Sequence, residues 1–297
     1  IFDPSMSAAE IEAAATAVFN KQKSNEFGAD RFALLFEPGT YGSATEPLNF
    51  EVGYYTSVAG LGRLPGDVII NGTINVHNQC YGDHCIALNN FWRSLSNLTI
   101  AVTDKPTAGC YAGEFWAVSQ AAPMRRVHVT GGQTTLMDYC TNPSFASGGF
   151  IADSKFDGTV INGSQQQWMT RNSTVGGWSN GVWNQVFSGV EGAPATCFPA
   201  ATACGGPYIT VAKSPVTKES PFLYQDDRGR YRVFVPAVQR NSSGTTWASG
   251  NPKGSSQSIE NFYVARPGDD ARTINAALAR GKQLLLTPGV YQLDRPI

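Results

Sequence analysis

The sequence predicts an all-β protein, a right-handed parallel β-helix of the pectin-lyase-like type with an N-terminal capping helix, then a connector and the first coil of a second β-helix. Two observations predict this fold. One signature occurs twice, an amphipathic helix followed by an apolar strand and the residues Pro-Gly-x-Tyr. Between the two copies lie short β-rich runs, spaced like the coils of a solenoid.

The first copy of the signature predicts the capping helix and the first strand. Ser7 and Glu10 form a capping box, and apolar residues recur at helical spacing over about 7–22. An apolar strand from Phe32 then runs into a Pro-Gly turn that ends at Tyr41. We expect the helix to cover the open edge of the first coil.

The second copy repeats this order near the end of the chain. Asp269 or Asp270 caps a helix, Gly281 ends it, and an apolar strand from Leu284 leads to the turn at Tyr291. The two copies lie too far apart along the chain to be neighbouring coils of one solenoid. They therefore predict two successive β-helix domains.

The β-rich runs between the copies have the length expected of solenoid coils. A β-sandwich is the main alternative, because it is also built of short strands with frequent turns. The helical caps and the uneven spacing of the runs favour the solenoid. The runs cover residues 68–76, 95–102, 124–130, 149–161 and 168–175.

Composition divides the chain into three parts. Residues 1–205 are expected to form the first parallel β-helix, and 206–262 a connector rich in Pro, Ser and Gly. Within the connector, runs 222–224 and 231–235 flank a turn and predict a β-hairpin. Residues 263–297 are expected to begin the second β-helix, and one coil cannot bury its own apolar row. The chain is therefore expected to be the N-terminal part of a longer protein, truncated or nicked at its end.

Overall composition excludes several classes of protein. Apolar residues make up 42% and charged residues 15%, a balance that favours a large buried core over disorder. The net charge of −1 shows no basic excess for a nucleic-acid or membrane partner. No apolar run approaches the roughly 18 residues that span a bilayer. Neither a nucleotide fingerprint nor a metal-ligand spacing is present, so no cofactor and no metal are expected.

The six cysteines fall as three neighbouring pairs along the chain. Six cysteines allow many connectivities, and local bridging is the simplest of them. An even count without zinc-finger spacing favours disulfides and an oxidising compartment. The pairs are Cys80 with Cys85, Cys110 with Cys140, and Cys197 with Cys204.

Asn-x-Ser/Thr sequons support the same compartment. Together with the cysteines they favour a secreted, extracellular glycoprotein. Such sequons also arise by chance in chains rich in Asn, Ser and Thr. The candidate glycosylation sites are Asn71, Asn97, Asn162, Asn172 and Asn241.

Four segments carry a family resemblance: 32–41, its repeat at 284–291, 163–168 and 222–236. They resemble a group of secreted actinobacterial and fungal β-helix proteins whose automated labels, adenylyl cyclase or coagulation factor 5/8-type domain protein, have no basis in these residues. In architecture the chain resembles glycoside hydrolase family 55, exo-acting β-1,3-glucanases with two β-helices side by side and a substrate cleft between them. The resemblance implies a partner in the second β-helix of the same protein. It also implies that the catalytic glutamate lies there, so no catalytic residue is carried over.

Three carboxylates are weak candidates for acid/base catalysis. Period-two alternation puts Asp153, Lys155 and Asp157 on one face of a strand, and with Phe156 inward this face is expected to be exposed to solvent. The two aspartates would have Cα atoms about 13 Å apart, beyond the roughly 6.5–9.5 Å between the carboxyl groups of inverting glycosidases. A solvated charge ladder is the simpler interpretation, and a cation site is a further alternative. Glu114, beside two aromatic residues, is a similar candidate.

Aromatic and amide residues cluster between 165 and 187 and suit a neutral glycan. Sugar rings stack on aromatic faces while amides bond their hydroxyl groups. The alternative is that these tryptophans pack as a satellite core under loops. The candidate substrate-binding residues are Gln166, Trp168, Arg171, Trp178 and Trp183.

These observations predict a secreted carbohydrate-active protein. The first hypothesis is a glycoside hydrolase acting on a neutral polysaccharide such as β-1,3-glucan. The second is a non-catalytic glycan-binding or cell-surface module, which the lack of a convincing acid/base pair supports. The third is a polyuronate lyase of the pectate or alginate type, which predicts calcium dependence and an acidic polymer.

Overall fold

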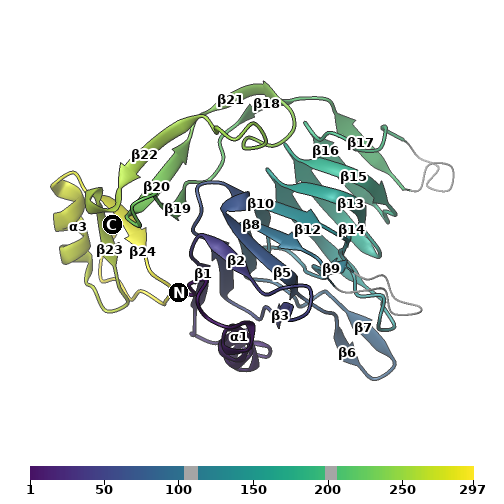
Figure 1. The fold of residues 1–297 in the computed structure, drawn as a ribbon, viewed down its shortest axis with the longest axis horizontal. Coiled ribbons are helices and arrows are strands. Elements are labelled where there is room, and N and C mark those ends of the chain that lie inside the picture. The colour runs from purple at the N-terminus through teal and green to yellow at the C-terminus, as the bar shows by residue number, and fades with distance from the viewer. Residues whose placement is uncertain (104–112, 198–205) are drawn as a thin grey trace.

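A computed structural model describes residues 1–103, 113–197 and 206–297, and most of it is a parallel sheet wound into a solenoid (Figure 1). Within the described residues the largest sheet has 15 strands, and every pairing in it is parallel. The predicted parallel β-helix is therefore confirmed. None of the described helices is long and apolar enough to cross a bilayer.

One face of the solenoid is a continuous ladder in which each strand pairs with its counterpart in the next coil. Val58, Leu95, Met124 and Ile151 are successive partners in this register, and all four are fully buried. Residues at the same register position in successive coils thus form one apolar row of the core. The strands in order are β1 (Phe32–Phe36), β4 (Thr56–Gly60), β8 (Arg93–Ala101), β10 (Met124–Thr130), β12 (Ala146–Ala152), β14 (Gln165–Arg171), β16 (Asn184–Ser188) and β17 (Tyr208–Val211).

The other strands of this sheet close the coils around the same core. Phe156 and Val175 are partners in one of these ladders, and both are buried. A 3-10 helix, η1 (Pro65–Asp67), leads into the first long strand of this group. The strands are β2 (Gly39–Tyr41), β3 (Leu48–Glu51), β5 (Val68–Asn75), β9 (Gly113–Phe115), β11 (Gln133–Thr135), β13 (Lys155–Ile161) and β15 (Thr174–Ser179).

A column of residues with left-handed backbone marks the corner of successive coils. Asn97, Arg126, Asp153 and Asn172 each follow a register-paired residue of the first ladder, and their φ angles lie between 46° and 56°. Asn and Asp tolerate this conformation better than most residues. The column bends each coil from one face of the solenoid to the next.

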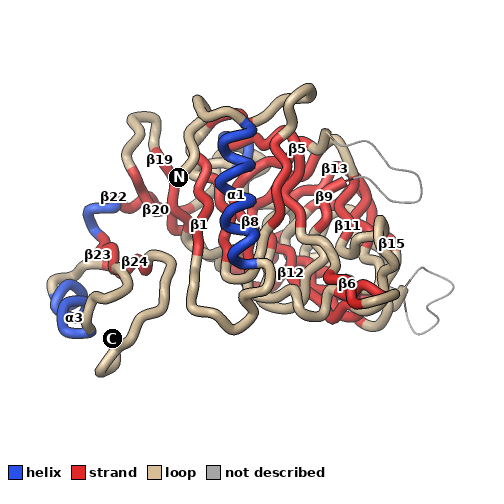
Figure 2. Tube along the Cα trace, turned by 90° about the horizontal axis from the view of Figure 1, so that it is seen from below, coloured by secondary structure: helices blue, strands red, loops and turns tan. Residues whose placement is uncertain are grey.

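The predicted capping helix is confirmed as α1 (Ala8–Gln22), which runs across the first coil (Figure 2). Ser7 and Glu10 form the expected capping box. Ile11 and Ala15 are fully buried in the main core. The helix therefore covers apolar side chains that would otherwise be exposed at the open end of the solenoid.

The segment after β17 arches along the solenoid as paired antiparallel strands (Figure 1). The predicted hairpin is confirmed, since β19 pairs with β20 in antiparallel register. The three-stranded sheet that contains the hairpin lies near the N-terminal end of the solenoid. The strands are β18 (Ser214–Thr217), β19 (Phe222–Gln225), β20 (Tyr231–Pro236), β21 (Gln239–Ser242) and β22 (Gly254–Ser258), followed by the 3-10 helix η2 (Ile259–Asn261).

This arching segment is fastened to the corner column of the solenoid. Thr246 donates hydrogen bonds to the Asp153 carboxylate from its backbone nitrogen, at 2.5 Å, and from Oγ1, at 2.8 Å. The indole nitrogen of Trp247 donates to the Asp153 carbonyl at 2.7 Å. Asn172 Nδ2 donates to Ser242 Oγ at 2.8 Å. The corner residues therefore hold the segment as well as bending the chain.

The second copy of the signature folds as predicted. β23 (Phe262–Ala265) and β24 (Gln283–Leu286) pair in parallel, with α3 (Ala271–Ala279) between them. Asp270 is the N-cap, and its side chain accepts from the backbone nitrogen of Thr273 at 2.7 Å. The element order of the first coil is thereby repeated.

A hairpin of β6 (Gln79–Tyr81) and β7 (His84–Ile86) projects from the solenoid and carries the disulfide Cys80–Cys85. This predicted pair is confirmed. Cys140 and Cys197 are also disulfide-bonded. Their predicted partners, Cys110 and Cys204, lie outside the described residues.

Three of the predicted glycosylation sites are wrong. Asn97, Asn162 and Asn172 are at most 2% exposed, and their side-chain amides bond inside the fold. A glycan cannot be attached to a side chain enclosed in this way. Asn71 is half-buried, whereas Asn241 is exposed.

Candidate functional site

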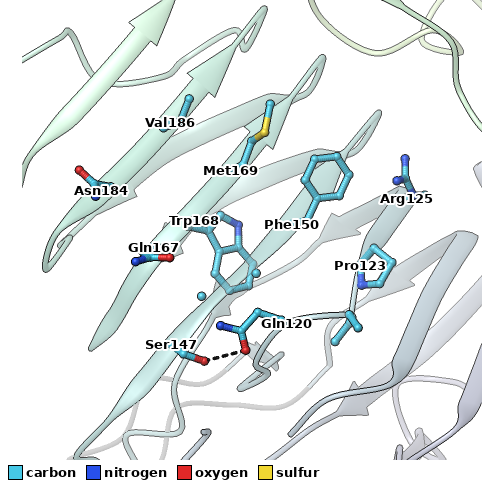
Figure 3. Close-up of a pocket in the computed structure, with 14 residues that line it drawn as sticks. Gln120, Pro123, Arg125, Ser147, Phe150, Gln167, Trp168, Met169, Asn184 and Val186 are labelled. Atoms are coloured by element: carbon cyan, nitrogen blue, oxygen red, sulfur yellow. Dashed lines mark hydrogen bonds between the residues drawn. The ribbon is translucent and has the colours of Figure 1, made fainter.

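A groove of about 630 Å³ lies on the outer face of the first ladder, across β10, β12, β14 and β16 (Figure 3). Gly148 and Gly149 contribute no side chains to its floor, and the Trp168 indole packs against Gly149. A Cβ atom at Gly149 would lie 2.5 Å from two carbons of this indole. Gly149 therefore lets the tryptophan ring approach the backbone.

One end of the groove is lined by amides and a hydroxyl. Gln120, Gln167 and Asn184 lie there with Ser147, whose Oγ donates to Gln120 Oε1 at 3.1 Å (Figure 3). Primary amides offer both donors and acceptors. This end can therefore bond a ligand rich in hydroxyl groups.

The other end is apolar and flat. Phe150, Met169 and Val186 are register partners on three successive strands, so their side chains form a row on the outer face (Figure 3). Met169 is 38% exposed, which leaves a substantial apolar surface open. Such a row matches the apolar face of a sugar ring.

An ion-pair cluster borders this apolar end. Arg125 lies 4.8 Å above the Phe150 ring, and Arg171 lies 5.9 Å from it. Glu219, a buried residue of the arching segment, bonds Arg171 at 2.8 Å and Arg125 at 3.5 Å. Burial lowers the pKa of Arg125, while Glu219 opposes that effect. The cluster joins the arching segment to the groove, and the Glu219 carboxylate offsets one of the two arginine charges.

A second cavity of about 820 Å³ continues from the first. It lies between the outer face of β1, β4 and β8 and the strand β24 with its Pro-Gly turn. Ala121 and Pro123 line both cavities, so the two form one groove along the ladder. The second cavity is lined mainly by apolar and aromatic side chains.

Only some of the predicted binding residues lie at the groove. Trp168 lines its floor but belongs to the core and is only 2% exposed, so it offers no open ring face. Gln167, rather than its neighbour Gln166, lines the cavity. Trp183 is 56% exposed just before Asn184, and its backbone nitrogen donates to the Gln166 carbonyl. Trp183 therefore lies at the rim.

The other two predicted binding residues have different surroundings. Trp178 lies on β15, outside the first ladder, and packs edge-to-face on Phe187 at 4.9 Å. It is part of the packing around the core, as the alternative interpretation had it. Arg171 borders the groove but is held by Glu219.

The expected exposure of Asp153 is wrong. Its side chain is fully buried, because β12 ends at Ala152 and Asp153 turns the chain with a φ of 50°. Period-two alternation does not extend through this corner. Burial raises the pKa of Asp153 to about 6, although Arg126 at 3.4 Å and Thr246 act in the opposite direction.

The remaining carboxylate candidates also lie away from the groove. Asp157 is exposed and pairs with Lys155 at 3.2 Å and His128 at 3.0 Å, so this part of the charge ladder is on the surface. Glu114 is fully buried and accepts from the Ile74 backbone nitrogen at 2.9 Å. Among the described residues, no carboxylate lines either cavity.

Reasoning from the sequence missed the half of the groove that comes from earlier coils. Gln120, Arg125, Ser147 and Phe150 lie outside the predicted 165–187 cluster. The available signal was the glycine pair within a β-rich run, which marks close approach of a ligand or another group. Strand register then brings these residues beside Gln167.

Comparisons with known proteins agree with this architecture. Residues 52–190 match a family described as rhamnogalacturonase A/epimerase, pectate lyase-like. Residues 262–297 match the LAM55 pectate lyase-like domain. Both matches are to β-helix families, one in the solenoid and one in the second copy of the signature.

One curated protein matches over all 297 residues at 50% identity, an exo-β-1,3-glucanase of Streptomyces sp. strain SirexAA-E. The solved structure of sacteLam55A from the same strain has a TM-score of 0.87 at 49% identity over 99% of this chain. A variant of it in complex with glucose has a TM-score of 0.85. The chain spans 45% of the curated protein and 49% of each solved chain.

Proposed function

We propose that this chain is the N-terminal part of a secreted hydrolase of β-1,3-glucan. The chain is a homologue of the Streptomyces exo-β-1,3-glucanase, because half of its residues are identical along its whole length. In this proposal the first ladder forms one wall of the substrate cleft. The expected resemblance to double β-helix glucanases of glycoside hydrolase family 55 is confirmed.

The composition of the groove is the observation that carries the proposal. Its open surface combines amides at one end with an apolar row at the other, beside a cluster in which Arg125 and Arg171 share the carboxylate of Glu219. A neutral glucan presents hydroxyl groups and apolar ring faces, so it fits both ends. Arg125 and Arg171 share the single carboxylate of Glu219, and Arg31 and Arg93 line the second cavity. The polyuronate alternative is therefore set aside by the homology to a β-1,3-glucanase and not by the charge of the groove.

The catalytic carboxylates are proposed to come from the second β-helix of the same protein. In the described part of the chain neither cavity has an acid, whereas glycoside hydrolysis uses a carboxyl pair. The proposed division is a first β-helix at 1–205, a connector at 206–262 and the start of the second β-helix at 263–297. The LAM55 match at 262–297 and the parallel pairing of β23 with β24 support the last part.

Secretion is part of the proposal. The disulfide Cys80–Cys85 closes an exposed hairpin, and such bonds persist in oxidising compartments. Asn241 is an exposed sequon and is the proposed glycan acceptor. Peptide mapping of protein secreted by a glycosylating host would test this site, and an unmodified Asn241 would contradict it.

Sugar release by the full-length protein tests the activity. The protein would be incubated with laminarin, pectin and alginate, and the products separated by chromatography. Release of glucose from laminarin alone is the expected result. Absence of release from every polymer would favour the non-catalytic binding module, and unsaturated uronates from pectin or alginate would favour the lyase.

A further inference from the structure

Trp92 is an exposed tryptophan at the point where the two cavities meet. Its side chain is 55% exposed and lines the second cavity. The residue at the same place in the next coil is Ala121, which lines both cavities. The indole therefore lies one coil away from the first cavity, on the same open face.

The ring is held on one side by an aromatic stack. Tyr55, its partner in the preceding coil, stacks with it at a centroid distance of 6.2 Å and an interplanar angle of 26°. The Arg31 guanidinium lies 3.5 Å from the Tyr55 ring, and the Tyr55 hydroxyl donates to the Glu26 carbonyl at 2.7 Å. These contacts form a three-layer stack that ends on the Trp92 indole.

The backbone under this stack is sterically unfavourable. Tyr55 and Trp92 have φ angles of 52° and 55°, a region that bulky residues rarely adopt. Glycine or asparagine would occupy it with less strain. Ala121, at the same place in the next coil, has a φ of 58°, so this conformation belongs to a second corner of successive coils and sets where the Trp92 side chain lies. The exposed part of the Trp92 ring lies beside the second cavity, so a ligand bound there can reach it.

We propose that Trp92 is a stacking platform for a glucosyl unit of a long β-1,3-glucan chain, at a subsite beyond the first cavity. The inference rests on the proposed function and deepens it, because it assigns the second cavity to the same polymer. A chain bound along the ladder contacts the amides at Gln120 and Gln167, passes Pro123 and stacks on Trp92. Short oligosaccharides occupy the first cavity alone, so this platform distinguishes ligands by length.

Substitutions of Trp92 in the full-length protein test this platform. Trp92→Asn removes the ring and suits the left-handed backbone, so its melting temperature is expected to equal or exceed that of the unmodified protein. Trp92→Phe retains a ring face. Phe27→Asn is the matched control, because Phe27 is 92% exposed and lines neither cavity.

Two readouts are compared, affinity electrophoresis in laminarin gels and the KM for laminaribiose and laminarin. Trp92→Asn is expected to weaken laminarin binding and raise its KM about tenfold, in line with the loss of one ring-stacking contact. The kcat and the KM for laminaribiose should stay within twofold. Trp92→Phe should recover most of the loss, and Phe27→Asn should behave like the unmodified protein.

Three results would overturn the inference: unchanged laminarin binding in Trp92→Asn, an equal loss for both substrates, or the same loss in Phe27→Asn. The same measurements test the proposed function separately from the platform. If laminarin binds in a Trp92-dependent way without being hydrolysed, the platform stands and the hydrolase does not. If the unmodified protein neither binds nor hydrolyses laminarin, both are wrong.

Discussion

Tyr41 and Tyr291 make the same two contacts in the two openings of a β-helix. Each hydroxyl lies within hydrogen-bond distance of the carbonyl four residues earlier and of a carbonyl on the neighbouring extended segment. The Pro-Gly-x-Tyr signature is therefore a structural device that ties the turn to the strand beside it. The accepting residues are Glu37 and Phe2 for Tyr41, at 2.8 and 2.9 Å, and Thr287 and Ala265 for Tyr291, at 2.9 and 2.8 Å.

Removing the Tyr41 hydroxyl should destabilise the first coil. Tyr41 is 2% exposed, so Tyr41→Phe removes an enclosed hydrogen bond to the Glu37 carbonyl, whereas the Phe2 carbonyl keeps the Glu37 backbone nitrogen as a donor. The free energy of unfolding should fall by about 1–3 kcal/mol. Urea denaturation followed by circular dichroism measures this. Tyr81→Phe is the control, because Tyr81 is 46% exposed and water replaces its bond to Gln79. Equal effects of the two substitutions would contradict a structural role for the signature.

The glycine of the signature is also required by the local structure. Gly39 has a φ of 152°, and a Cβ atom there would lie 2.6 Å from Pro4 Cβ, an atom of a rigid ring. Gly39→Ala should therefore cost more than about 2 kcal/mol. Gly66→Ala is the control, since a Cβ at Gly66 meets no atom within 4 Å. Comparable losses of stability in the two alanine variants would show that the close approach to Pro4 is not required.

The parts of the fold that the sequence predicted well are those with local signals. The capping box at Ser7, the strand at Phe32–Phe36 and the hairpin around Asp226 each depend on residues close in sequence. The duplicated signature then indicated two β-helix openings. These signals are local, so no knowledge of neighbouring coils was needed.

The corners and the groove depend instead on which coils lie side by side. Asp153 alternates correctly with its neighbours in sequence, but a left-handed corner after Ala152 turns it into the fold. Trp168 sits in a run of polar residues, yet its ring is enclosed because Gly149 of the adjacent strand provides the space. Such effects follow from register between strands of different coils, which composition and periodicity do not specify.

Gln167 should contribute to substrate binding, whereas its neighbour should not. Gln167 lines the first cavity, and Gln167→Ala removes a donor and an acceptor, so the KM for laminarin is expected to rise about three- to tenfold with little change in kcat. Initial rates of glucose release by the full-length protein measure both constants. Gln166→Ala is the matched control and should be unchanged. A fall in kcat without a change in KM would place Gln167 outside the binding surface.

Asp153 should make the stability of the fold depend on pH. Its pKa is raised from 3.8 to about 6, because burial disfavours the carboxylate more than Arg126 favours it. The folded state then binds the proton more tightly than the unfolded chain does, so this contribution is complete below about pH 4 and is lost as the pH rises through 6. A shift of this size corresponds to a loss on the order of 3 kcal/mol between pH 4 and pH 7. Asp153→Asn cannot titrate, and asparagine occupies the same corner at Asn97 and Asn172, so the variant should lack this loss.

Urea unfolding of the two proteins from pH 4 to pH 7.5 provides the measurement. The difference in unfolding free energy between the unmodified protein and Asp153→Asn should change steadily over this range. As the pH rises, the unmodified protein should lose stability relative to the variant. Asp157→Asn is the control. Burial acts to raise the pKa of Asp157, but its contacts with His128, Thr130 and Lys155 together lower it, so its contribution should change in the opposite direction. Parallel stability curves for the unmodified protein and Asp153→Asn would show that the buried carboxylate titrates at its ordinary pKa. The Asp153 carboxylate would then bind Thr246 of the arching segment without losing free energy by being buried as an anion.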